Sequence, residues 1–101
     1  MEIKFKTKRL EKCYQEHRLA AREFGEEVAR KYIQRVNVIK AAKGLDELTR
    51  LPGLRCHPLT GNRQGQYAIN LTGFHRLIFR LEGEQLRIVR IEEVSKHYDD
   101  K

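Results

Sequence analysis

Arginine, histidine and tyrosine side chains gather in the second half of this sequence, after the turn at residues 52–53. Side chains of these types can cleave RNA through its own 2′-hydroxyl group. A base takes the 2′ proton, a cation stabilises the phosphate, and an acid protonates the leaving 5′ oxygen. Histidine, glutamate and tyrosine can carry the protons, and arginine binds a phosphate through a planar fork of donors. The candidates are Arg55, His57, Arg63, Tyr67, His75, Arg76, Arg80, Arg87, Arg90, Glu93, His97 and Tyr98.

The charge of the chain indicates the same kind of partner. Its 101 residues include 21 Lys and Arg against 14 Asp and Glu, a net charge of +7. Phosphate polymers are common partners of such surfaces, because each neutralised phosphate releases counterions. The alternative is a basic protein with no such partner. No phosphate-binding loop, dinucleotide fingerprint, His-Glu-x-x-His or nucleophile elbow is present, so we expect no cofactor and no metal.

Arg76 has the most unusual surroundings of the arginines. It precedes an apolar run at residues 77–79, and a charge is rarely placed in such a segment without a partner. The structural alternative is a salt bridge to Glu92 or Glu93. We expect Arg76 to stabilise the phosphate, with that carboxylate orienting its guanidinium group.

The other candidates have structural alternatives as well. His57 precedes a proline, where a histidine is more often a surface hydrogen-bonding group than a catalyst. The family resemblance of its segment, given below, implies instead a proton carrier or a phosphate-binding imidazolium. His97 and Tyr98 lie in a charged tail, where the alternative is a frayed end. We expect them, with Glu93, to supply the remaining proton transfer. Arg63 lies in a Gly-rich loop and is either solvated or bound to RNA; the expected RNA-binding residues are Arg55, Arg63, Tyr67, Arg80 and Arg90.

Two cysteines offer weaker alternatives. Cys56 adjoins His57, as in a Cys-His nucleophile, but a free cysteine is more often a small buried hydrophobic residue. Cys13 and His17 are four residues apart, as metal ligands on a helix can be, but the sequence has no second pair. Without a secretory segment or an apolar run of ~20 residues, the chain is expected to be cytoplasmic with reduced thiols.

The N-terminal half has the hydrophobic pattern of one strand followed by helices. Residues 2–6 alternate apolar and charged side chains, which predicts a strand with one wet face. From 8 to 42 the apolar residues recur every three or four positions, as on one face of a helix. A glycine inside a helix costs about 1 kcal/mol, so Gly25 predicts one break between Leu19 and Glu26.

The second half is typical of β-structure. After Gly44 ends the helical region, one short helical turn is expected at 45–51, and a polar tail at 92–101. Strands are predicted at residues 54–59, 66–72, 74–81 and 86–91, the last of them inside the sheet. This order predicts one α+β domain over residues 1–101, with two layers. The N-terminal strand and the helices would pack on a twisted antiparallel sheet, which the N-terminal strand would join.

Three segments of the second half resemble motifs of one protein family. Residues 57–65, HPLTGNRQG, are similar to the H-P-L-K-G-x-R-x-G segment of HigB-like toxins. These toxins belong to the RelE/ParE superfamily and are also labelled plasmid-maintenance killer proteins. Residues 74–79, FHRLIF, resemble the family's aromatic-x-Arg-aliphatic-x-Phe strand, and residues 91–98, IEEVSKHY, resemble its C-terminal strand end. The resemblance spans residues 54–98.

The chain departs from the family pattern at two places. Thr60 stands where many relatives have a lysine, which removes one contact to phosphate or base. The tail has His97 before Tyr98, whereas better-known relatives end in Asp-Tyr-His. The roles of Glu93, His97 and Tyr98 as acid or base therefore stay open.

The resemblance implies a microbial-type RNase fold, with two helices on a twisted antiparallel sheet and an active groove on its open side. It also implies a growth-inhibiting toxin that cleaves mRNA in the ribosomal A site without a metal and is neutralised by an antitoxin. We expect that antitoxin to be a small HigA-like protein with a helix-turn-helix. Operator DNA would be bound only through the antitoxin, and no membrane partner is expected.

Two other functions fit the sequence. The superfamily also contains gyrase poisons, and a fold alone does not choose between activities. A topoisomerase poison or a non-catalytic RNA- or DNA-binding protein would need the cations but not the paired proton carriers. An inactive toxin would act only with its antitoxin, as a transcriptional repressor.

Overall fold

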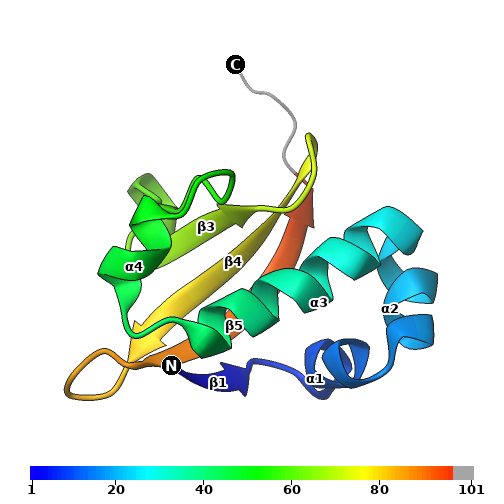
Figure 1. Cartoon of the computed structure of the whole chain (residues 1–101), viewed down its shortest axis with the longest axis horizontal. Coiled ribbons are helices and arrows are strands. Elements are labelled where there is room, and N and C mark those ends of the chain that lie inside the picture. The colour runs from blue at the N-terminus through cyan, green and yellow to red at the C-terminus, as the bar shows by residue number, and fades with distance from the viewer. Residues whose placement is uncertain (97–101) are drawn as a thin grey trace.

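Helices α3 and α4 cover one face of a five-stranded sheet, and α1 and α2 pack beside α3 (Figure 1). The computed structural model describes residues 1–96 of the chain. The elements are β1 (Glu2–Phe5), α1 (Lys8–Gln15), α2 (His17–Phe24), α3 (Glu26–Ala41), α4 (Leu45–Arg50), β2 (His57–Pro58), the 3₁₀ turn η1 (Gly61–Arg63), β3 (Gln66–Asn70), β4 (His75–Glu82) and β5 (Ile88–Lys96). The predicted two-layer α+β fold is confirmed.

The sheet has the order β1-β5-β4-β3-β2. Strands β2 to β5 form antiparallel pairs, whereas β1 lies parallel to β5, so the sheet is mixed rather than wholly antiparallel. The N-terminal strand joins the sheet, as predicted, and β5 lies between β1 and β4. A parallel edge is possible here because four helices separate β1 from the other strands and return the chain to the same end of the sheet.

The helical region is broken twice instead of once. Gly25 adopts φ +91° and separates α2 from α3, inside the predicted interval. The second break is at Glu16, whose extended backbone (φ −129°, ψ 105°) separates α1 from α2. Neither glycine nor proline marks that position, so the sequence pattern gave no signal for it. Thr7 caps α1 by accepting a hydrogen bond from the Leu10 amide at 3.1 Å.

One core forms between the helices and the covered face of the sheet. The apolar side of α3 contributes Tyr32, Val36 and Ile39, none of which is exposed. The Tyr32 hydroxyl donates to the Leu10 carbonyl oxygen at 2.7 Å, so its burial leaves no unpaired polar group. The sheet contributes Ile69, Leu77, Phe79, Val89 and Ile91.

Two predicted boundaries in the second half are wrong. The expected strand at 54–59 is reduced to β2, because Arg55 adopts a left-handed backbone conformation (φ 52°) that interrupts pairing. The last strand is longer than the predicted 86–91. It begins at Ile88 and continues to Lys96, because Glu93 and Val94 pair with β4 beyond an irregularity in the register. None of the helices within residues 1–96 is long and apolar enough to cross a membrane.

Candidate active site

Alternate residues of the strands form a face that the helices do not cover, which we call the open face. Because successive side chains of a strand point to opposite sides, Arg76, Ile78 and Arg80 lie opposite the core residues Leu77 and Phe79. The register places Arg76 between Asn70 and Ser95, Ile78 between Ala68 and Glu93, and Arg80 between Gln66 and Arg90. In Figure 1 the open face points away from the viewer, behind the helices.

A small pocket lies at the β2 edge of the open face. It has a volume of about 210 Å³ and is lined by Arg55, His57, Ala68, Asn70 and Arg76. The register explains this assembly, since His57 pairs with Ala68 and Asn70 pairs with Arg76 across neighbouring strands. Three predicted site residues, Arg55, His57 and Arg76, are thus brought together from segments about 20 residues apart in sequence.

His57 is held by the backbone of the turn that precedes it. Its Nδ1 atom lies 2.8 Å from the carbonyl oxygen of Arg55, and the imidazole is exposed. A carbonyl oxygen can only accept, so Nδ1 carries the proton and the Nε2 atom is left to exchange one. Arg55 itself holds a backbone conformation that costs a non-glycine residue of order 1–3 kcal/mol, and such strain clusters at functional sites.

Arg76 forms no ion pair with any residue between 1 and 96. Its Nε atom is buried and has no hydrogen-bond partner there. The suggested salt bridge to Glu92 or Glu93 is therefore absent, because the register sets Ser95 rather than a carboxylate opposite Arg76. A buried donor without a partner is rare in native structures, and an oxyanion would satisfy it.

Glu93 is engaged by the Gly-rich loop. One guanidinium nitrogen of Arg63 lies 2.7 Å from Glu93 Oε2, and the other donates to Gln66 Oε1 at 2.9 Å. The predicted choice for Arg63, solvated or bound to RNA, omitted this pairing. The pair fastens the loop around η1 to β5, next to the row of the open face that contains Ile78.

Arg80 and Arg90 lie together further along the open face, around the carboxylate of Glu92. Their nitrogens approach its oxygens to 3.7 and 3.3 Å, and Lys6 Nζ approaches to 3.8 Å. The side chain of Glu92 is only 4% exposed. Arg80 and Arg90, two of the four arginines predicted to bind RNA, are therefore on the same face as Arg76.

Tyr67 lies apart from the other predicted site residues. Its ring stacks on Phe79 with the centroids 5.5 Å apart and the planes 17° from parallel, against the core. The alternation of β3 that sends Ala68 to the open face sends Tyr67 to the covered face. His97 and Tyr98 lie outside the described residues. The strand that leads to them ends at Lys96, which pairs with His75 beside Arg76.

The sequence also contains site residues that were not singled out. Asn70 lines the pocket, and the alternation of residues 66–72 already places it on the polar side of that strand. Lys6 and Glu92 had no comparable signal, because their proximity depends on β1 pairing with β5, across more than 80 residues. His75, one of the candidates from the sequence, places its Nδ1 atom 3.1 Å from the hydroxyl oxygen of Thr72.

The cysteine alternatives fit the structure poorly. Burial raises the pKa of the Cys56 thiol to about 11, which disfavours the thiolate that a nucleophile needs. The pKa of Cys13 is also raised, first by burial and then by the charge of Glu23. His17 Nε2 lies 3.1 Å from Glu26 Oε2, and no group of three potential ligands for a metal is found within residues 1–96.

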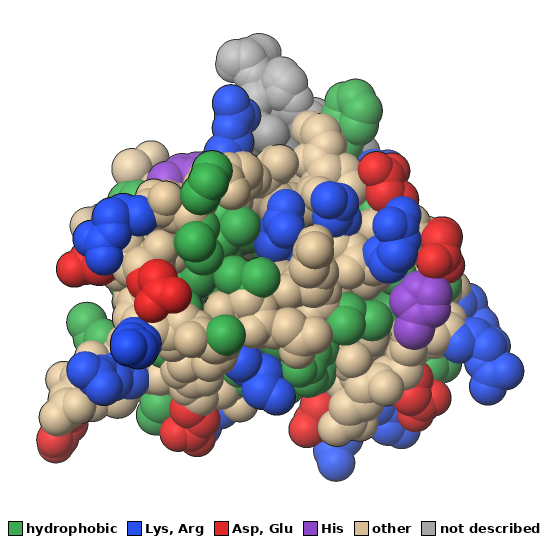
Figure 2. Space-filling model, viewed as in Figure 1, with side chains coloured by type: hydrophobic (Ala, Val, Ile, Leu, Met, Phe, Trp, Pro, Cys, Tyr) green, Lys and Arg blue, Asp and Glu red, His purple; other side chains and the backbone are tan. Residues whose placement is uncertain are grey.

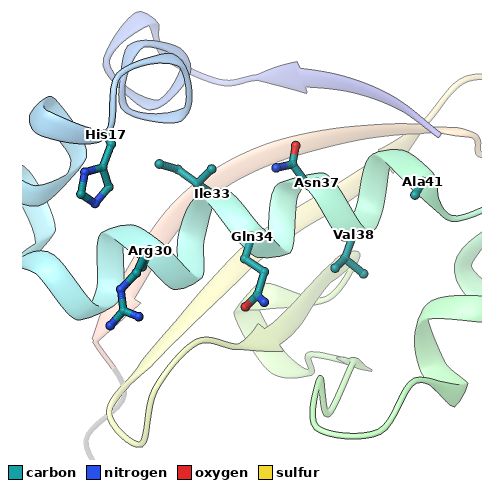
Figure 3. Close-up of a pocket in the computed structure, with 7 residues that line it drawn as sticks. All are labelled: His17, Arg30, Ile33, Gln34, Asn37, Val38 and Ala41. Carbon is teal, nitrogen blue, oxygen red and sulfur yellow. The ribbon is translucent and has the colours of Figure 1, made fainter.

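A larger pocket of about 600 Å³ follows the outer side of α3 (Figure 3). Figure 3 shows Ile33 and Val38 together with the polar side chains of His17, Arg30, Gln34 and Asn37 around it. It lies on the helix layer, away from the open face, and His17 is already engaged by Glu26. The smaller pocket beside Arg76 is the one that combines an unpaired cation with a free imidazole nitrogen.

The fold is shared by bacterial toxins of known structure. A YoeB/ParE toxin from Agrobacterium tumefaciens superimposes with a TM-score of 0.65 at 16% identity, over 97% of this chain and 100% of that one. The YoeB-YefM complex from Staphylococcus aureus gives 0.62 at 16% identity, over 97% and 98%. The E. coli DinJ-YafQ toxin-antitoxin complex gives 0.57 at 18% identity, over 95% and 91%.

The family follows from the sequence itself. Residues 3–92 match the model of the HigB-like toxin family, described as the RelE-like toxin of the type II toxin-antitoxin system HigB. The chain therefore belongs to this family, and it is a type II toxin of the RelE superfamily. No curated protein is similar enough in sequence to serve as a relative.

Proposed function

We propose that this toxin is a cytoplasmic endoribonuclease that cleaves mRNA on the ribosome by 2′-hydroxyl attack. The observation that carries the proposal is the pocket in which Arg76, unpaired among the described residues 1–96, lies beside His57, whose Nε2 is free to exchange a proton. A protein that only bound nucleic acid would need the cation but not the adjacent proton carrier.

Each residue of the pocket is proposed to perform one part of the cleavage reaction. His57 takes the proton of the 2′-hydroxyl through Nε2. The 2′ oxygen then bonds to the adjacent phosphorus, and the bond from phosphorus to the 5′ oxygen breaks. Arg76 stabilises the charge that develops on the phosphoryl oxygens, and the buried Nε supplies one donor that needs no solvent to be displaced. The products are a 2′,3′-cyclic phosphate and a 5′-hydroxyl end.

The leaving 5′ oxygen requires a proton, for which we propose His97 or Tyr98. Both follow directly on β5, whose last residue pairs beside Arg76. Glu93 was an equal candidate, but Arg63 engages its carboxylate at 2.7 Å. Glu93 therefore fits better as the residue that holds the Gly-rich loop at the site.

The shallow pocket supports the proposed dependence on the ribosome. A pocket of about 210 Å³ cannot enclose a nucleotide and align its 2′ oxygen without further help. The ribosome holds mRNA in a fixed conformation, and such orientation can be worth several kcal/mol of the barrier.

The proposed regulatory partner is a small antitoxin with a helix-turn-helix, of the HigA type. Relatives of this fold are known in YoeB-YefM and DinJ-YafQ toxin-antitoxin complexes. A net charge of +7 favours a partner that either covers the cationic face of the toxin or holds the toxin away from the ribosome. Operator DNA would then be reached through the antitoxin.

Sequencing of mRNA 5′ ends after brief expression in growing cells tests the proposal. We expect new 5′-hydroxyl ends inside translated regions with the wild-type toxin and none with His57→Ala. In vitro, we expect the purified toxin to cut ribosome-bound mRNA faster than the same RNA alone. Equal cleavage of both RNAs would refute the ribosome requirement. Intact mRNA together with inhibited DNA supercoiling would instead identify a topoisomerase poison.

A further inference from the structure

A buried carboxylate holds three cations together on the open face, several residues away from the Arg76 pocket. Glu92 belongs to β5 and is 6% exposed as a residue. Lys6 follows β1, Arg80 belongs to β4 and Arg90 to β5, and each places a nitrogen within 3.3–3.8 Å of the Glu92 carboxylate. We call Lys6, Arg80, Arg90 and Glu92 the Glu92 cluster.

The cluster has more positive charge than burial of Glu92 requires. One neighbouring cation is sufficient to compensate a buried carboxylate, and further cations at the same place repel one another. The next residues outward do not change the balance. Glu82 contacts Lys4 at 3.8 Å and Arg90 at 4.0 Å, and it adds one negative charge while Lys4 adds one positive charge. An excess of two positive charges therefore remains at this place.

The N–H groups of these cations are also available to donate hydrogen bonds. Within residues 1–96, the side chains of Lys6, Arg80 and Arg90 donate no hydrogen bond, and their approaches to Glu92 are ion pairs only. Glu92 Oε2 accepts no hydrogen bond either. A network that existed only to bury Glu92 would direct its donors at that carboxylate. The side chains of Arg80 and Arg90 are 41% and 35% exposed, so their donors can reach an external acceptor.

The loop before β3 closely approaches the Arg80 side chain. Gly65 adopts φ +94°, and a Cβ atom at this position would lie 3.2 Å from a terminal nitrogen of Arg80. Glycine thus allows both the turn and the close approach of the loop to the guanidinium group. Arg80 is confined by Gly65 on one side and Glu92 on the other, which reduces the entropy that a bound ligand would have to remove.

We propose that Lys6, Arg80 and Arg90 form a second phosphate-binding site for the backbone of the RNA strand that is cleaved at Arg76. The proposal rests on the proposed function, because it assigns the cluster to the same RNA. Arg76 and Arg80 are four residues apart on one face of β4, or ~13 Å. At this separation the cluster is placed to bind a different phosphate of the strand. Glu92 is a positioning residue that fixes the cations without touching the RNA.

Binding of an uncleavable RNA measures this site without depending on catalysis. A 2′-O-methyl nonanucleotide lacks the attacking hydroxyl, and its affinity can be followed by fluorescence anisotropy as salt is varied. Arg80→Gln and Arg90→Gln should each weaken binding about tenfold, as expected for one charged hydrogen-bonding contact. Each should also lower the slope of log K against log salt by ~0.7, the value for one phosphate contact of a single strand. Arg87→Gln, an exposed arginine outside the open face, should change neither quantity.

Two further variants separate binding from folding and from net charge. Lys6→Gln removes a cation whose side chain is 52% exposed, so it should weaken binding without lowering the melting temperature. The double variant Arg80→Gln/Glu92→Gln has the formal charge of the wild type. If Arg80 contacts the RNA, this double variant stays weak. If its affinity returns to the wild-type value, the effect was net charge alone and the second site does not exist.

The second-site proposal and the nuclease proposal can be overturned independently of each other. Wild-type affinity in the Arg80 and Arg90 variants, together with loss of cleavage in His57→Ala, would overturn the second site and leave the proposed function standing. Salt-dependent binding that needs Arg80 and Arg90, in a protein that cuts no mRNA, would support the second site and overturn the nuclease. In active protein, Arg80→Gln should raise KM and leave kcat unchanged, since Arg80 lies away from the reacting phosphate.

Discussion

The two faces of β4 differ although they share one backbone. On the covered face Leu77 and Phe79 are fully buried beneath the helices. On the open face Arg76 and Arg80 keep donors that find no hydrogen-bond partner among residues 1–96. Strand alternation thus places the core residues on one side and the proposed ligand-binding residues on the other. The two sets of side chains can therefore be altered separately.

The distribution of charge shows the same contrast. Figure 2 views the molecule from the helix side, where Lys and Arg side chains alternate with Asp and Glu around the rim. On the open face, the cations of β1, β4 and β5 gather around one buried carboxylate. The face is not simply solvated, because Ile78 and Ala68 on this side are 0% and 1% exposed. The register sets Ala68, Ile78 and Glu93 side by side, between the rows that contain Arg76 and Arg80.

Phe79→Ala tests the covered face and should have the largest effect. Phe79 is fully buried and stacks on Tyr67, and removal of a buried Phe ring costs ~3–5 kcal/mol. Small domains are stable by only ~5–15 kcal/mol, so much of the protein should unfold at growth temperature. Urea denaturation followed by circular dichroism measures the change. A loss below 1 kcal/mol would show that Phe79 is not part of the main core.

Deletion of residues 97–101 tests whether the open face needs the tail for proton transfer. We expect cleavage to fall by ~10²–10⁴, the contribution of one general acid or base. The free energy of unfolding should change by less than about 0.5 kcal/mol, because the core formed within residues 1–96 stays intact. His97→Ala and Tyr98→Phe then assign the loss to one residue. A deletion variant as toxic as the wild type would transfer the proton chemistry to Glu93.

Arg76→Ala tests the open face without disturbing the covered one. Cleavage should fall by ~10²–10³, typical of one lost electrostatic donor in a transition state. Stability should change little, because no residue within 1–96 pairs with this guanidinium group. Arg87→Ala is the matched control, since Arg87 is exposed and precedes β5. If both Arg76→Ala and His57→Ala stayed toxic, a non-catalytic binding function would replace the nuclease.

The predictable parts of the fold are those set by local pattern. The apolar periodicity of α3 and the alternation of β3 and β4 appear directly in the sequence, and with them the face to which Arg76 belongs. The extension of β5 to Lys96 was not predictable, because Glu92 and Glu93 are polar and resemble a tail. They join the strand because Val94 packs against the core beyond them.

The predictable parts of the site follow the same rule. His57 and Arg76 stand out through the residues beside them, so their pocket was partly foreseen. The Arg63–Glu93 pair joins positions 30 residues apart, and its partners depend on the register between strands. Glu92 illustrates the limit most clearly. In the sequence it was an alternative partner for Arg76, whereas the register gives it to Lys6, Arg80 and Arg90.

Thr7→Ala tests the helix layer with a smaller change. The Thr7 side chain accepts the Leu10 amide at the start of α1, and loss of such a cap costs ~0.5–2 kcal/mol. Stability should fall by about 1 kcal/mol, while cleavage measured below the melting temperature stays at the wild-type rate. This result would be the opposite of that for Arg76→Ala, which is expected to lose activity and keep stability. A loss of cleavage in folded Thr7→Ala would show that the two layers are coupled.

Cys56→Ala should have the smallest effect, although Cys56 adjoins His57 in the chain. Burial raises the pKa of its thiol to about 11, from the ordinary 9.0, so ~100-fold fewer thiolates are present at pH 8 than for a free cysteine. Cleavage by Cys56→Ala should therefore equal that of the wild type. Alkylation by iodoacetamide should be slow at neutral pH and rise as the pH approaches 11, measured in Cys13→Ala protein so that Cys56 alone reports. Rapid alkylation at pH 7 together with loss of cleavage in Cys56→Ala would restore the Cys-His nucleophile. Slow alkylation with full activity would leave His57 to act on the RNA and not on its neighbour in sequence.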